Sequence, residues 1–132
     1  MATIQRLIPP EAHAALQATA GAVLIDVRDP VEFGFVGHPV GAVNIPWKFA
    51  PEMRPNPDFL AQVRQAALDT ETPLFLLCRS GQRSLAAAEA LAEAGFTQLA
   101  NIEEGFEGPL DGHGHRSTLG GWRYHGLPWK QS

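Results

Sequence analysis

Residues 74–91 read LFLLCRSGQRSLAAAEAL, and the pattern changes twice within them. The apolar run 74–77 is typical of a strand that is buried on both faces of a sheet. The Ala- and Leu-rich residues 81–94 predict a helix, which Gly95 ends. A short polar loop that begins at Cys78 joins the two. The carboxyl end of a parallel strand, followed by a helix N-terminus, is where open α/β sheets bind ligands.

The segments on either side of this unit alternate in the same way between apolar runs and helical patterns. The predicted strands are 22–27, 42–45 and 97–102, and the predicted helices begin at Pro9, Asp29 and Asn56, the last running to about Leu68. Strands that alternate with helices imply βαβ units and a mainly parallel sheet. The chain shows no internal repeat and no linker, so we expect one domain over residues 1–132.

The composition excludes several classes of partner. Hydrophobic residues make up 45% of the chain and charged residues 18%, which is a globular balance and not that of a disordered chain. The net charge of -4 gives no overall attraction to nucleic acid or anionic lipid. The apolar runs are too short to span a bilayer, and the first residues lack a signal-peptide pattern. We therefore expect a cytoplasmic protein with no nucleic-acid or membrane partner.

Cys78 is the only cysteine, so the chain can form no internal disulfide, and the neighbours of this residue decide its role. The first turn of a helix has unpaired N–H groups and the positive end of a dipole, which both stabilise an anion. Arg79 and Arg83 add positive charge, and Gly81 lets the loop curl so that N–H groups point inward. These features predict a thiolate nucleophile. The alternative is an inert, buried cysteine beside two solvated arginines, but inert cysteines lie more often in apolar surroundings.

Three stretches together resemble the rhodanese family. The loop that starts at Cys78 resembles the active-site loop of rhodaneses, in which a catalytic cysteine begins a six-residue cradle. Residues 26–33, DVRDPVEF, are similar to the family's D-V-R-x-x-x-E stretch followed by Phe or Tyr. Residues 37–46, GHPVGAVNIP, resemble its G-H-I-x-G-A-x-N-I-P stretch, with Pro39-Val40 in place of the usual order. The stretches stand in the family order, and the resemblance covers roughly residues 7–106.

This resemblance implies a rhodanese-like α/β fold, with a five-stranded, mainly parallel sheet and helices on both faces. It also implies a sulfurtransferase, in which Cys78 takes sulfane sulfur from thiosulfate or a similar small anion and becomes a persulfide. A thiol, including a protein thiol, or cyanide then accepts that sulfur. The family chemistry uses no metal and no organic cofactor.

The resemblance also assigns roles to neighbouring residues. Arg79 and Arg83 orient the donor or stabilise the leaving anion, and Asp26 and Arg28 support the site by holding neighbouring loops through charged hydrogen bonds. We expect Glu32 and His38 to be structural. The backbone N–H groups that cradle the persulfide belong to Arg79, Ser80, Gly81, Gln82, Arg83 and Ser84.

Two other functions compete with this interpretation. Cysteine-based phosphatases and arsenate reductases use Cys-x5-Arg, whereas here Ser84 stands six residues after Cys78 and Arg83 gives Cys-x4-Arg. A loop that is one residue shorter makes a smaller cradle, which suits a sulfur atom better than a phosphate. The second alternative is a non-catalytic binding module or a sulfur relay to a dedicated protein partner. The presence of Cys78 in a full polar loop argues against a module without chemistry.

The chain departs from the family near its C-terminus. Rhodaneses commonly reach a Gly-Gly pair and a Trp soon after the last strand, but here Gly120-Gly121-Trp122 comes later, so residues 107–121 are predicted to be an insertion that folds over the mouth of the site. Asp111, His113 and His115 lack the spacing of a zinc site, and we expect a solvated loop without metal. Residues 122–132 are predicted to pack on the body through Trp122, Tyr124, Leu127 and Trp129.

Overall fold

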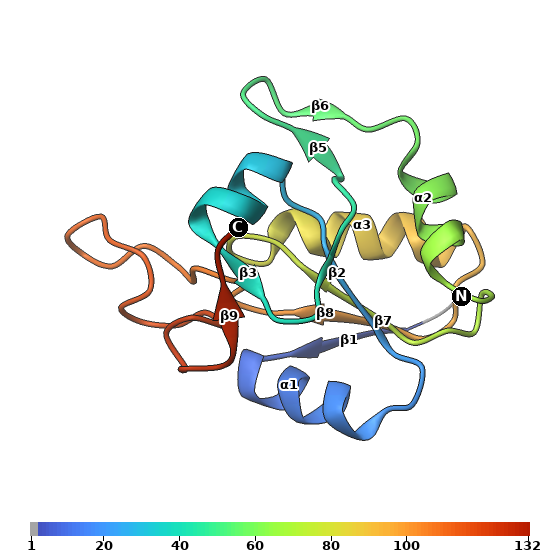
Figure 1. The fold of residues 1–132 in the computed structure, drawn as a ribbon, viewed down its shortest axis with the longest axis horizontal. Coiled ribbons are helices and arrows are strands. Elements are labelled where there is room, and N and C mark those ends of the chain that lie inside the picture. The colour runs from blue at the N-terminus through green and yellow to red at the C-terminus, as the bar shows by residue number, and fades with distance from the viewer. Residues whose placement is uncertain (1–2) are drawn as a thin grey trace.

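The computed structural model describes residues 3–132, and its centre is a five-stranded sheet (Figure 1). The strands lie in the order β1-β8-β7-β2-β4, and all four pairings are parallel. Their bounds are Ile4–Leu7 for β1, Val23–Asp26 for β2, Val43–Asn44 for β4, Leu74–Leu77 for β7 and Leu99–Ile102 for β8. The predicted α/β class and five-stranded parallel sheet are confirmed.

Within the central sheet, strand β1 is the strand that the hydrophobic pattern did not predict. It pairs with β8 at the edge of the sheet, with Ile4 opposite Leu99 and Leu7 opposite Ile102. Its two middle residues, Gln5 and Arg6, are exposed, so the segment has no apolar run to reveal it.

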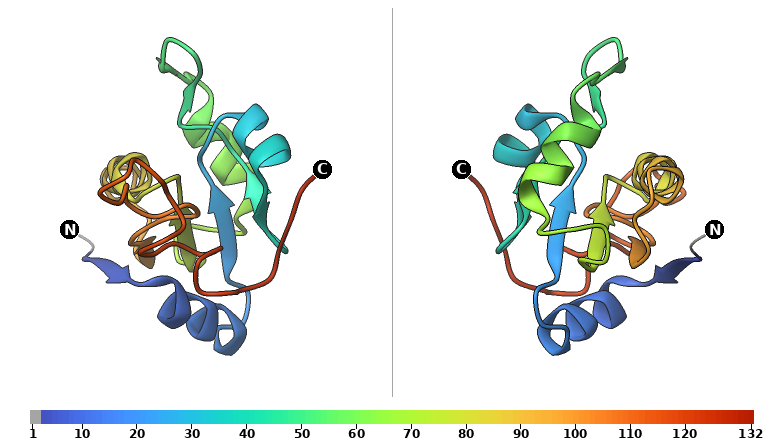
Figure 2. Two further views of the ribbon diagram at one scale, coloured as in Figure 1. Left: turned by 90° about the vertical axis from the view of Figure 1, so that its left-hand side faces the viewer. Right: turned by 90° about the vertical axis from the view of Figure 1, so that its right-hand side faces the viewer.

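Helices cover both faces of the sheet (Figure 2). Helix α1 (Pro9–Ala18) lies on one face, and α2 (Phe59–Ala66) and α3 (Gln82–Glu93) lie on the other. Successive side chains of β7 alternate between the faces: Leu74 and Leu76 join the core under α2 and α3, and Phe75 and Leu77 join the core with α1. This double burial explains why β7 is a continuous apolar run.

Two of the predicted helices differ in the structure. Helix α2 ends at Ala66, and the predicted last residue, Leu68, is 96% exposed beyond it. The segment after Asp29 forms only a short π-helical turn, η1 (Glu32–Val36), which the Asp29 side chain starts by accepting the Val31 N–H at 2.8 Å. This turn matters for the site because it carries Glu32.

Two small antiparallel pairs complete the structure. Strand β3 (His38–Pro39) pairs with β9 (Trp129–Lys130), and β5 (Lys48–Phe49) pairs with β6 (Arg54–Pro55). The β3–β9 pair ties the C-terminal tail to the body. None of the helices in residues 3–132 is both long and apolar enough to cross a membrane.

The C-terminal segment packs only in part. Trp122 is buried, and its indole N–H donates to the Pro128 carbonyl at 2.9 Å, whereas Tyr124 remains half exposed. Residues 107–121 form a loop that projects from the body (Figure 1). Within the described part of the chain, no hydrogen bond joins residues 109–119 to the Cys78 loop. The first residues of the predicted insertion, Glu107 and Gly108, donate their N–H groups to the Arg79 carbonyl at 2.9 and 3.2 Å, so this loop is joined to the Cys78 loop at its base.

Candidate active site

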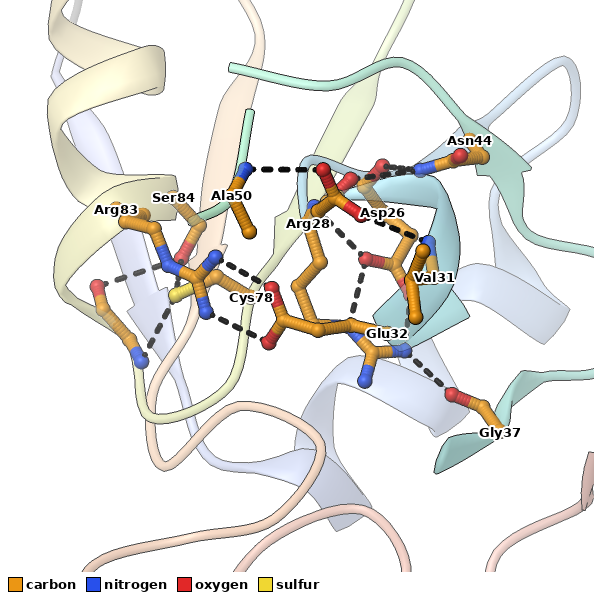
Figure 3. Close-up of polar contacts among 12 residues, drawn as sticks. Asp26, Arg28, Val31, Glu32, Gly37, Asn44, Ala50, Cys78, Arg83 and Ser84 are labelled. Carbon is orange, nitrogen blue, oxygen red and sulfur yellow. Dashed lines mark hydrogen bonds and ion pairs between the residues drawn. The ribbon is translucent and has the colours of Figure 1, made fainter. Parts of the chain in front are cut away.

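The sulfur of Cys78 lies at the carboxyl end of β7, between that strand and the first turn of α3 (Figure 3). The residue is 1% exposed. Its Sγ accepts the Gly81 N–H at 3.1 Å and lies 3.3 Å from the Ser84 hydroxyl. Gly81 has a φ of 110°, a left-handed conformation that favours glycine, and this turn brings its N–H back to the sulfur.

The start of the loop turns its backbone N–H groups away from the segment that packs on it. The carbonyls of Cys78 and Arg79 accept the N–H groups of Phe106 at 2.8 Å and Glu107 at 2.9 Å. Because a trans peptide holds C=O and the next N–H in opposite directions, the N–H groups of Arg79 and Ser80 point away from the 106–107 turn. No hydrogen bond among residues 3–132 takes the N–H groups of Arg79, Ser80, Gln82, Arg83 or Ser84. These donors remain available to an anion.

The two arginines of the loop lie in different surroundings. Both terminal nitrogens of Arg83 donate to the Glu32 carboxylate, at 2.9 and 3.0 Å. Arg79 is exposed and forms no ion pair with any described residue. Arg79 is therefore the loop cation that faces solvent without a partner in this part of the chain, whereas Glu32 neutralises Arg83.

The Glu32–Arg83 pair is partly buried, and both pKa values shift in the direction that favours the charged forms. Burial alone would raise the pKa of Glu32, but the hydrogen bonds and charge of Arg83 outweigh it and hold that pKa below its usual 4.5. Burial alone would lower the pKa of Arg83, but Glu32 raises it, with a smaller contribution from Cys78. The ion pair is thus a stable part of the site at neutral pH.

Asn101 is a site residue that the sequence analysis did not identify. Its Oδ1 lies 2.5 Å from the Ser84 hydroxyl, and its Nδ2 donates to the Gly81 carbonyl at 3.2 Å and to the Glu103 carboxylate. Because an amide oxygen only accepts, Ser84 donates its single hydrogen there. The sequence contains a signal for Asn101, because it is the one polar residue of a buried strand whose other residues are apolar. Like Cys78, it lies near the carboxyl ends of the parallel strands.

Asp26 and Arg28 form a buried unit behind the site. Arg28 donates to the Asp26 carboxylate from Nε at 2.9 Å and from Nη2 at 2.6 Å, and its Nη2 also reaches the Gly37 carbonyl at 2.5 Å. Both side chains are 0% exposed, and the guanidinium lies 4.7 Å from the centre of the Phe106 ring. This unit connects the end of β2 to β3 and to the turn that packs on the Cys78 loop.

The histidine-containing loop provides no cluster of metal ligands. Within residues 3–132, no group of three or more His, Cys, Asp or Glu side chains is placed to hold a metal ion. The Asp111 carboxylate instead accepts the hydroxyl of Thr118 and the backbone N–H groups of His115 and His113, which lower the pKa of Asp111. This carboxylate therefore shapes its own loop.

Comparisons with known proteins agree with this fold. Residues 9–109 match the family model described as a rhodanese-like domain. Thiosulfate sulfurtransferase 16, chloroplastic, from Arabidopsis thaliana is 36% identical over 113 residues, which cover 84% of this chain and 82% of that protein. Thiosulfate sulfurtransferase GlpE from Stutzerimonas stutzeri (strain A1501) is 35% identical over 107 residues, which cover 81% and 85%. Senescence-associated protein DIN1 from Raphanus sativus is 40% identical over 91 residues, but this chain spans only 49% of its length.

Experimental structures show the same architecture over the whole chain. The crystal structure of Rv0390 from M. tuberculosis superposes with a TM-score of 0.88 at 39% identity and covers 100% of both chains. The solution structure of the polysulfide-sulfur transferase homodimer from Wolinella succinogenes has a TM-score of 0.67 at 25% identity and covers 98% of this chain and 80% of that one. The chain therefore belongs to the family of rhodanese-like domain proteins.

Proposed function

We propose that this protein is a sulfurtransferase in which Cys78 carries the transferred sulfur as a persulfide. The observation that carries the proposal is the contact between the Cys78 sulfur and the Gly81 N–H, at the centre of a loop whose other N–H groups are available to an anion. A persulfide on Cys78 would accept the same N–H donors, and a cysteine sulfur is the nucleophile that sulfur transfer needs. The relatives named thiosulfate sulfurtransferases support the same reaction class.

The reaction we propose has two substitution steps. The Cys78 thiolate attacks the outer sulfur of thiosulfate, a new S–S bond forms, and the S–S bond of thiosulfate breaks so that sulfite leaves with the electron pair. An acceptor thiolate or cyanide then attacks the outer sulfur of the persulfide, and the Cys78 thiolate leaves. Neither step requires an external oxidant or reductant, because in each the nucleophile supplies the electron pair of the new bond and the leaving group takes the pair of the bond that breaks.

The neighbouring residues suit three supporting tasks. The loop N–H groups stabilise the negative charge of the persulfide and of the departing sulfite. Arg79, which is exposed at the edge of the loop, attracts an anionic donor. Asp26 and Arg28 hold the loops on which the site is built.

The phosphatase alternative is weakened by the position of Arg83. In that mechanism an arginine grips the oxyanion with two parallel donors, but here both terminal nitrogens of Arg83 are bound by Glu32. The Cys-x4-Arg spacing adds to this mismatch. Sulfur transfer therefore remains the better supported chemistry.

Thiocyanate formation from thiosulfate and cyanide tests the proposal, with p-nitrophenyl phosphate hydrolysis as the counter-assay. We expect wild type to form thiocyanate and Cys78→Ser to form none above background, with no phosphate release from either. Phosphate release that depends on Cys78, without thiocyanate, would replace sulfur transfer by the phosphatase function.

A further inference from the structure

Glu32 brings a negative charge into the site from a distant part of the sequence. It lies in η1, 51 residues before its partner Arg83, and both its oxygens bind the Arg83 guanidinium. Figure 3 shows the Glu32 carboxylate facing the Arg83 guanidinium, with the Cys78 sulfur close to Arg83. The side chains of Arg83 and Glu32 are 17% and 23% exposed, so solvent screens this pair less than a surface pair.

The Glu32–Arg83 pair limits the hydrogen bonds that Arg83 can donate to a substrate. A guanidinium recognises an oxyanion best with two parallel N–H donors, and here Glu32 occupies the two terminal nitrogens. A thiosulfate oxygen that approaches Arg83 finds this pair of donors already bound and meets the negative charge of Glu32 beside the donors that remain. With Cys78 as a thiolate, the group of Arg79, Arg83, Glu32 and Cys78 carries no net charge, so the site holds no surplus of positive charge for a dianion.

The repulsion between Glu32 and a sulfur donor depends on the charge of that donor. The Coulomb energy between Glu32 and a donor is proportional to the donor charge, so a dianion is repelled twice as strongly as a monoanion at the same position. Donors that present the same outer sulfur with less charge are therefore less affected by Glu32.

We propose that Glu32 is a specificity-determining residue of this site, which competes with the donor for Arg83 and so selects singly charged sulfane donors over doubly charged ones. The proposal rests on the function proposed above, because it assumes that Cys78 accepts sulfane sulfur. It assigns to Glu32 a role in donor choice and no part in the bond-making steps.

Thiosulfate and methanethiosulfonate form a matched pair of probes. Both carry one outer sulfur on a sulfonyl group, but thiosulfate has two negative charges and methanethiosulfonate has one. Attack by Cys78 releases sulfite from the first and methanesulfinate from the second, so both leave the same persulfide. The measured quantity is kcat/KM for each donor with cyanide as acceptor, in wild type and Glu32→Gln.

We expect Glu32→Gln to raise kcat/KM for thiosulfate about tenfold and kcat/KM for methanethiosulfonate only about threefold, since the electrostatic effect scales with charge. The matched control is Glu89→Gln, which removes the same charge from an exposed position on α3 and should change neither value by more than about 1.5-fold. Glu32→Met, an apolar side chain of similar length, removes the charge in a second way and should give the same preference, and thermal unfolding of each variant checks that it is folded.

The outcomes separate this proposal from the proposed function. If wild type uses both donors but Glu32→Gln and Glu32→Met leave their ratio unchanged, or lower both values equally, Glu32 only holds Arg83 in place and the inference is overturned. If wild type uses neither donor, the sulfurtransferase function itself fails, and the role of Glu32 fails with it.

Discussion

Gly105 lies against the carbonyl group of Cys78, and no space remains between them for a side chain. A Cβ on Gly105 would contact the Cys78 oxygen and would lie 2.6 Å from the carbonyl carbon of Arg79. The same residue has a φ of +63°, which disfavours other residue types. This close approach lets the Phe106 N–H reach the Cys78 carbonyl at 2.8 Å, so Gly105 fixes the backbone from which the sulfur is presented.

Replacing Gly105 should therefore damage both stability and activity. We expect Gly105→Ala to lower the free energy of unfolding by about 3 kcal/mol or more and to reduce sulfur transfer at least about tenfold, because the loop must move to admit the methyl group. Gly114→Ala is the control: its φ is +77°, but its Cβ would meet nothing within 4 Å, and we expect a loss of about 1 kcal/mol. Urea unfolding measures the free energy of unfolding of both variants. Equal losses of stability in the two variants would show that backbone strain alone is responsible.

The contact between Ser84 and Asn101 leads to a second prediction. Ser84→Ala leaves the buried Asn101 Oδ1 without its donor, which should cost about 1–3 kcal/mol of unfolding free energy. It also loosens the Asn101 amide, which holds the Gly81 carbonyl and so positions the Gly81 N–H at the Cys78 sulfur, and we expect kcat/KM for thiosulfate to fall at least about tenfold. Ser80→Ala serves as the control, since the Ser80 hydroxyl makes no hydrogen bond with any described residue. This substitution should change the unfolding free energy by less than about 0.5 kcal/mol. A Ser84→Ala protein as stable and active as Ser80→Ala would contradict this account.

The buried Asp26–Arg28 pair should behave differently from a surface pair. Asp26→Asn leaves the Arg28 charge buried without a counter-ion, and we expect a loss of about 3–5 kcal/mol. Arg6→Gln breaks the Arg6–Glu103 pair, in which Arg6 is 60% exposed, and should cost no more than about 1 kcal/mol. Thermal and urea unfolding of the two variants provide the comparison. Similar small losses in both would mean that the buried pair contributes little.

The Glu32–Arg83 pair predicts how stability depends on pH. Burial would raise the pKa of Glu32, but Arg83, with a smaller contribution from Arg28, holds it below 4.5, so the unfolded chain takes up this proton at a higher pH than the folded chain. The stabilising contribution of Glu32 is therefore present above about pH 4.5 and is lost as the pH falls through the lower, folded-state pKa. The difference in unfolding free energy between wild type and Glu32→Gln should be constant near neutral pH and should shrink in acid. A difference that grows in acid would reverse the sign of this coupling.

The sequence predicted the parts of the fold that local patterns control. Strand β7 and helix α3 stand where the apolar run and the Ala-rich segment placed them, because a strand buried on both faces and a helix ended by Gly95 each leave a local signature. Strand β1 left none, since its middle residues face solvent at the sheet edge. The pairing of β3 with β9 depends on two segments about 90 residues apart, which no local pattern connects.

The same distinction applies to the site. The position of Cys78 and its loop could be predicted because the strand, loop and helix are contiguous in the sequence. The pairing of Arg83 with Glu32 could not, because the two residues are 51 positions apart and only the tertiary fold brings η1 to α3. The role of Asn101 was only partly predictable: it is a polar residue in a predicted strand, but the contact of its amide with Ser84 is a tertiary feature.

Intact mass spectrometry of the purified protein, before and after incubation with thiosulfate, tests the central claim most directly. We predict that wild type gains the mass of one sulfur atom, that cyanide removes it, and that Cys78→Ser gains nothing. A wild-type protein with a demonstrably reduced thiol and no added mass, or a Cys78→Ser protein that gains the same mass, would contradict the assignment of Cys78 as the sulfur carrier from thiosulfate.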